Sequence, residues 1–83
     1  MALYTISYDL RNRRDYQTLY DELNEFNAVK ILESYWCFNR TNTSAAGLRD
    51  HFAKFIDSDD GLFVAEVSSW ASRSTDSTPK NLK

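Results

Sequence analysis

The stretch Tyr4-Thr5-Ile6-Ser7-Tyr8-Asp9-Leu10 carries the strongest structural signal in the chain. Every second residue of it, Tyr4, Ile6 and Tyr8, is large and apolar, and this period of two predicts a strand over residues 2–9 with one buried face. The residues between them are mixed in polarity, so we expect the second face to be half open. The strand ends at Asp9, a carboxylate, and an arginine-rich loop follows at once, with Arg11, Arg13 and Arg14.

A helix is predicted directly after this loop. Asp15 is a suitable N-cap, because its side chain can accept hydrogen bonds from the first turn, and Asn27 is a suitable end. Apolar residues at spacings of three and four form a single stripe on this helix, as expected for a helix packed on a sheet. The stripe consists of Tyr16, Leu19, Tyr20, Leu23 and Phe26.

The remainder of the folded part predicts two more strands, a helix and a last strand. β-Favouring residues over 28–32 and 34–39 indicate two strands with a bend near Glu33, or one long kinked strand. Thr43 or Ser44 caps a second helix, whose apolar stripe continues to Phe55. A polar turn at 57–61 precedes a strand over 62–67. The order β-α-β-β-α-β predicts an α+β fold of the ferredoxin-like type, an antiparallel sheet with two helices on one face.

Length and composition predict one small domain. The 83 residues fit a single domain over 1–70, followed by a polar tail over 71–83 that we expect to be disordered. A chain this short buries a modest core, which favours a homodimer. The net charge of −2 argues against strong nonspecific binding to phosphate backbones. A single cysteine, Cys37, and no long apolar run indicate a cytoplasmic protein without a membrane span.

Three short motifs give the chain a resemblance to a known family. They are Tyr8-Asp9 at the end of the first strand, the segment 33–38 (ESYWCF) and the acidic turn 57–61. In this order and spacing they resemble the small CRISPR-associated nuclease-like family, the accessory subunit of spacer integration in antiviral defence, and the related virulence-associated D interferases. The match spans residues 2–67. The resemblance implies a ferredoxin-like homodimer whose open sheet faces meet. The two copies of Asp9 would together hold one divalent ion, with Mg²⁺ as the candidate.

The candidate site residues each have a second interpretation. Asp9 is the candidate metal ligand and catalytic residue, because hard cations prefer carboxylates, or it caps the turn after its strand. The three arginines are candidate phosphate clamps, or they form a solvated loop paired with carboxylates. The full set of candidate nucleic-acid contacts is Tyr8, Arg11, Arg13, Arg14 and Ser34.

Other reactive side chains are predicted to be structural. His51 lies at the flank of the second helix's apolar stripe, and nothing places it near Asp9. Cys37 lies between Trp36 and Phe38 with no activating base beside it, so we expect an inert thiol. The acidic turn at 57–61 lacks the spacing of a calcium loop.

Two functions remain open at this point. The acidic balance and the lack of a second catalytic group favour a stand-alone relative of the family, a dimeric module that binds nucleic acid or a protein partner with weak or no catalysis. The alternative is a divalent-metal endonuclease acting on RNA or DNA, or a toxin-like RNA interferase, with Asp9 from both subunits. Cleavage that requires Mg²⁺ and disappears in Asp9→Ala distinguishes the two.

Overall fold

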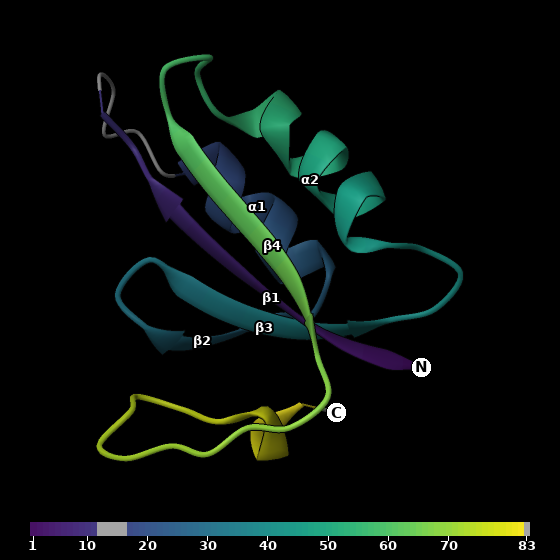
Figure 1. Ribbon diagram of the computed structural model, residues 1–83. Coiled ribbons are helices and arrows are strands. Elements are labelled where there is room, and N and C mark those ends of the chain that lie inside the picture. The colour runs from purple at the N-terminus through teal and green to yellow at the C-terminus, as the bar shows by residue number, and fades with distance from the viewer. Residues whose placement is uncertain (12–16, 83) are drawn as a thin grey trace.

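The computed structural model describes residues 1–11 and 17–82, and Figure 1 shows their arrangement. In chain order the elements are β1 (Ala2–Asp9), α1 (Gln17–Glu25), β2 (Val29–Leu32), β3 (Tyr35–Arg40), α2 (Ala45–Phe52), the 3₁₀ turn η1 (Ala53–Phe55), β4 (Gly61–Val67) and the 3₁₀ turn η2 (Pro79–Asn81). The two middle strands predicted from the sequence are thus separate, and the turn between them falls at the predicted bend near Glu33.

The four strands form one antiparallel sheet in the order β2-β3-β1-β4. β1 lies between β3 and β4, and β3 lies between β1 and β2, so each helix connects two strands that are not neighbours. The α+β class predicted from the sequence is confirmed. In Figure 1 both helices lie behind the sheet, on the same side.

The core fills the space between the sheet and the two helices. Tyr4, Ile6 and Tyr8 of β1 point into it, as the alternation predicts. Trp36 and Phe38 of β3 join them, because antiparallel pairing places Trp36 opposite Ile6 and Phe38 opposite Tyr4. Burying an apolar side chain of this size stabilises the fold by about 1.5–3 kcal/mol. The helices contribute Leu19, Leu23, Leu48 and Phe52 to the same cluster.

Local backbone chemistry sets the element ends. Ser44, one of the two caps expected for the second helix, accepts a hydrogen bond from Gly47 N–H at 3.1 Å. Asn27 follows α1 with φ at 55°, a left-handed conformation that asparagine tolerates and that stops a helix. The cap predicted at Asp15 and the start of the stripe at Tyr16 lie outside the described residues.

The C-terminal segment, residues 68–82, runs beneath the sheet face opposite the helices, shown in yellow-green and yellow in Figure 1. Asp76 N–H donates to the carbonyl of Ile31 in β2 at 2.8 Å. Trp70 and Pro79 line an apolar groove with β-sheet residues that include Leu3 and Tyr35. The disorder expected for residues 71–83 remains a prediction. Two apolar side chains, Trp70 and Pro79, and the backbone N–H of Asp76 contact the sheet.

Candidate functional site

Asp9 lies at the C-terminal end of β1, as predicted. In the β1–β4 ladder it is opposite Gly61, the first residue of β4, so it stands beside the turn that follows α2. Its side chain is 74% exposed. The end of β1 therefore presents a solvated carboxylate next to the acidic turn at residues 57–60.

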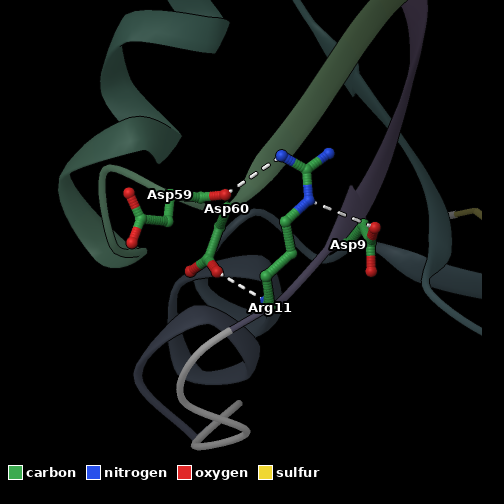
Figure 2. A network of polar contacts seen from close by, with 4 residues as sticks. All are labelled: Asp9, Arg11, Asp59 and Asp60. Carbon is green, nitrogen blue, oxygen red and sulfur yellow. Dashed lines mark hydrogen bonds and ion pairs between the residues drawn. The ribbon is translucent and has the colours of Figure 1, made fainter.

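Arg11 connects Asp9 to this turn. Its Nε lies 3.4 Å from Asp9 Oδ2, and its Nη1 donates to the Asp59 carbonyl at 3.1 Å. Its backbone N–H donates to Asp60 Oδ1 at 2.8 Å. Figure 2 shows the guanidinium between Asp9 on one side and the backbone of Asp59 on the other. We call these four residues, Asp9, Arg11, Asp59 and Asp60, the Arg11 clasp.

The acidic turn is closed by its own hydrogen bonds. Asp60 accepts from Asp57 N–H at Oδ2, at 2.8 Å, and the Asp60 N–H donates to the Asp57 carbonyl at 3.1 Å. A side chain added at Gly61 would place a Cβ 3.0 Å from Arg11 Nη2, so the Arg11 guanidinium would have to shift by a few tenths of an ångström. The predicted turn is confirmed. Each carboxylate oxygen of Asp60 accepts a hydrogen bond from a backbone N–H, Oδ1 from Arg11 and Oδ2 from Asp57.

Among residues 1–11 and 17–82, no group of side chains around Asp9 has the make-up of a Mg²⁺ site. The carboxylate already faces a guanidinium, which disfavours a second cation at the same oxygens. No cluster of three or more His, Cys, Asp or Glu side chains suited to a metal occurs in the described part of the chain. Mg²⁺ prefers several oxygen ligands in octahedral geometry. The Mg²⁺ expected from the resemblance thus remains a prediction about two copies of Asp9 in a dimer.

The other predicted contacts have different environments. Tyr8 is 5% exposed, and its hydroxyl accepts a hydrogen bond from Trp36 Nε1 at 3.1 Å. The ring belongs to the core, and the predicted contact of Tyr8 with nucleic acid remains a prediction. Ser34 occupies the turn between β2 and β3 with φ at 57°, and its carbonyl accepts from Tyr8 N–H at 3.2 Å. Arg13 and Arg14 lie outside the described residues.

Several cations of the described surface have carboxylate or aromatic partners. Lys30 lies 3.7 Å from Glu33, and Arg49 lies 3.0 Å from Asp50. The Arg40 guanidinium lies 3.9 Å from the centre of the Phe26 ring. Such exposed pairs contribute little to stability, but they reduce the positive charge available to a phosphate backbone.

Two side chains with expected structural roles are placed accordingly. Cys37 is fully buried in β3, and this burial raises the pKa of its thiol to about 11. His51 Nε2 lies 2.5 Å from Glu22 Oε2, in a contact that joins α2 to α1. Neither side chain approaches the Arg11 clasp through any contact of the described residues.

Sequence reasoning did not single out Phe63, which is 70% exposed in the middle of β4. The register places it opposite Ser7, on the face away from the helices. Ser7, Asp9 and Phe63 line a shallow hollow at this end of the sheet. The sequence could have predicted this exposure from the alternation along the strand. Phe63 and Ala65 point to one face, and Leu62, Val64 and Glu66 point to the other, which the helices cover.

Comparison with known proteins adds no assignment: no family model matches this chain, and no solved structure matches it. None of the helices in the part of the chain that the structure describes has the length and apolar character needed to cross a membrane.

Proposed function

We propose that this protein is a small non-catalytic module whose partner is another protein. The observation that carries the proposal is the Arg11 clasp. The candidate catalytic carboxylate, Asp9, and the candidate phosphate clamp, Arg11, face each other, and Arg11 is further bound to the acidic turn. Both side chains thus have a structural task, the joining of the end of β1 to the start of β4.

The surface favours a protein over a nucleic acid. The chain has a net charge of −2, and Lys30 and Arg49 lie near carboxylates. Large apolar side chains are exposed instead, with Phe63 at 70%, Leu32 at 44% and Trp70 at 40%. Two of the three are aromatic, and aromatic side chains are enriched in protein–protein interfaces.

The fold assignment and the family resemblance form part of the same proposal. The order β2-β3-β1-β4, in which β3 separates β1 from β2 and β1 separates β3 from β4, supports a ferredoxin-like arrangement. The position of Asp9 at the end of β1 agrees with the motif that carries the resemblance to the CRISPR-associated nuclease-like family. On this proposal the chain is a stand-alone relative in which the nuclease chemistry has no role.

The second candidate is a metal-dependent nuclease, favoured by the exposure of the Asp9 carboxylate. An ion pair this exposed is weak, so a divalent cation held between two copies of Asp9 can compete with Arg11. The substrate is RNA or DNA, and the dimer is required for activity.

A cleavage assay distinguishes the candidates. Single- and double-stranded RNA and DNA are incubated with the full chain in Mg²⁺, Mn²⁺ or EDTA, beside Asp9→Asn and the control Asp21→Asn, an exposed carboxylate on α1. We expect the same low background in all three proteins. Metal-dependent cleavage that is lost only in Asp9→Asn contradicts the proposal and establishes the nuclease. Binding of the same oligonucleotides, measured by fluorescence anisotropy, tests the preference for protein; tight binding in 150 mM salt contradicts it.

A further inference from the structure

β4 has an edge that no other strand of the sheet covers. β4 is an outer strand, and its ladder joins it to β1 alone. Outside the regular ladders, no backbone–backbone hydrogen bond found among the described residues involves residues 61–67. An outer strand presents N–H and C=O groups outward, and another strand pairs with these groups readily. The other outer strand, β2, has four residues and receives the N–H of Asp76.

The sequence of β4 does not protect this edge. The strand reads Gly-Leu-Phe-Val-Ala-Glu-Val, with no proline or lysine and one charged residue, Glu66. Proteins normally block an exposed edge with lysine, proline, a bulge or a very short strand. The β1–β4 register is also regular over its whole length, from Leu3–Val67 to Asp9–Gly61. β4 therefore has the properties of a strand that pairs with another chain.

We propose that β4 pairs antiparallel with β4 of a second copy of this chain, about a two-fold axis at Val64. This register pairs all seven residues of each strand, from Gly61 opposite Val67 to Val67 opposite Gly61. Directly opposite residues share a face in an antiparallel ladder, so the helices of both copies lie on the same side of one continuous sheet. The interface is isologous, as a two-fold dimer requires.

The side-chain pairs in this register are compatible. On the face away from the helices, Phe63 lies opposite Ala65 of the second copy, which gives the exposed ring a small apolar neighbour. On the helix face, Leu62 lies opposite Glu66 of the second copy. The two Glu66 carboxylates are thereby kept apart, and no like charges are paired across the strands.

Charge complementarity identifies the second copy as the occupant. Arg49 of α2 lines a hollow with Ala45, Ala46, Leu62 and Val64, beside the free edge of β4. The register brings Glu66 of the second copy opposite Leu62, and hence next to this arginine. Arg49 is 57% exposed, and among the contacts of the described residues it is paired only with its chain neighbour Asp50. Breaking such an exposed ion pair to form one with Glu66 of the second copy costs little free energy. Both copies contribute the same pair, so the interface gains two Arg49–Glu66 contacts.

This inference rests on the proposed function in one respect, that the partner is a protein, and it names that partner. It replaces the dimer expected through the open sheet face, where residues 68–82 of the same chain already cover Leu3 and Tyr35. Its test uses association and cross-linking, whereas the proposed function is tested by cleavage, so the failure of one is separable from the failure of the other.

Cross-linking at the axis is the decisive experiment. In Val64→Cys the two new thiols lie directly opposite each other, at a Cα separation of about 4.5–5.5 Å, which a disulfide can span. In the control Val67→Cys, which leaves the Arg49–Glu66 contacts intact, the two thiols are six residues apart along the strand, about 20 Å, which is too far. We expect a covalent dimer from Val64→Cys under mild oxidation, and none from Val67→Cys or the parent chain, whose Cys37 is buried. A Val64→Cys protein that stays monomeric, or equal cross-linking of both variants, overturns the register.

A charge exchange tests the interface without altering the strand's apolar residues. Sedimentation velocity of the full chain from 1 to 300 µM should show a monomer–dimer equilibrium. Arg49→Glu should weaken dimerisation by about tenfold, as should Glu66→Arg, and the double variant should recover most of the loss. Circular dichroism verifies that each variant is folded. A monomer at every concentration overturns the proposal, and so does a dimer whose dissociation constant changes in neither single variant. A chain that is monomeric because its β4 edge binds a different protein counts as the first of these outcomes.

Discussion

At the scale of single residues, burial sets the chemistry of Cys37. The thiol lies in β3 at 0% exposure, between the core residues Trp36 and Phe38. Because a thiolate is poorly stabilised away from water, burial raises the pKa of Cys37 from 9.0 to about 11. The thiolate is the reactive form, so the folded protein holds this cysteine in an inert state.

We predict that Cys37 reacts with a thiol reagent only after unfolding. At pH 8 the labelling of the native protein should be at least about a hundredfold slower than in 6 M urea, since both ionisation and access are restricted. The measurement is the rate of colour release from an aromatic disulfide reagent. Labelling of the native chain at the unfolded rate contradicts this burial.

The same shift predicts a pH dependence of stability. Below pH 9 the thiol is protonated in both the folded and the unfolded chain, so it contributes no pH dependence to the free energy of unfolding. Between pH 9 and about 11 the unfolded chain loses the proton while the folded chain keeps it, so the free energy of unfolding falls as the pH rises. Tyrosine and lysine also titrate in this range. The readout is therefore the difference in urea stability between the protein and Cys37→Ala, which should narrow from pH 9 to 11; a constant difference contradicts the shift.

The Arg11 clasp shows where residue-level reasoning from sequence stops. The position of Asp9 at a strand end followed from alternation alone, and the pairing of Arg11 with Asp9 was one of the two interpretations considered. The bond from Arg11 N–H to Asp60 joins residues 49 positions apart. Such a contact depends on β1 and β4 being neighbours, which the pattern within either strand does not encode.

At the scale of elements, a polar contact between Glu22 and His51 joins the two helices. Glu22 of α1 and His51 of α2 meet at 2.5 Å, with side chains 21% and 36% exposed. Phe26, Phe52 and Phe55 surround the imidazole with ring centres 5.3–5.5 Å away. The contact is thus partly shielded from water, and it fixes the position of one helix against the other.

We predict that Glu22→Gln and His51→Gln each destabilise the fold, by about 0.5–1.5 kcal/mol, because each leaves its partner with a weaker hydrogen bond. The double variant should lose less than the sum, with a coupling of about 0.5–1 kcal/mol between the two sites. The measurement is urea unfolding followed by circular dichroism. Glu25→Gln, an exposed change on the same helix, serves as the control and should alter the free energy of unfolding by less than about 0.5 kcal/mol. Strictly additive losses contradict a direct contact.

The elements themselves were largely predictable, because periodicity is a local property. The strand over 2–9, the last strand, the cap at Ser44 and the bend near Glu33 all agree with the structure. The Glu22–His51 contact was not predictable, although a structural role for His51 was expected. A helix stripe indicates which side faces the sheet, but not which residues of two helices meet at their flanks.

At the scale of the whole molecule, the C-terminal segment covers part of the sheet face opposite the helices. Residues 68–82 cross beneath the face opposite the helices and meet β2 at its outer edge through the Asp76–Ile31 bond (Figure 1). Only 7% of the Ile31 surface is exposed, although Ile31 is outside the main core cluster. Ile31 lines the same groove as Trp70 and Pro79, so the segment helps to cover it. A sequence with few apolar residues can therefore still complete a small fold, if those few lie where the sheet needs them.

We predict that deletion of residues 68–83 lowers the free energy of unfolding by about 1–3 kcal/mol, the scale of exposing one large aliphatic side chain together with the loss of one backbone bond. Urea unfolding should also give a smaller slope, since less surface is left to be exposed. Lys80→Ala, an exposed change within the segment, should leave the stability within about 0.5 kcal/mol. Deletion without loss of stability would support the disorder expected from composition. It would also free the sheet face for a partner, and face-to-face association of the shortened chain would then compete with pairing at the β4 edge.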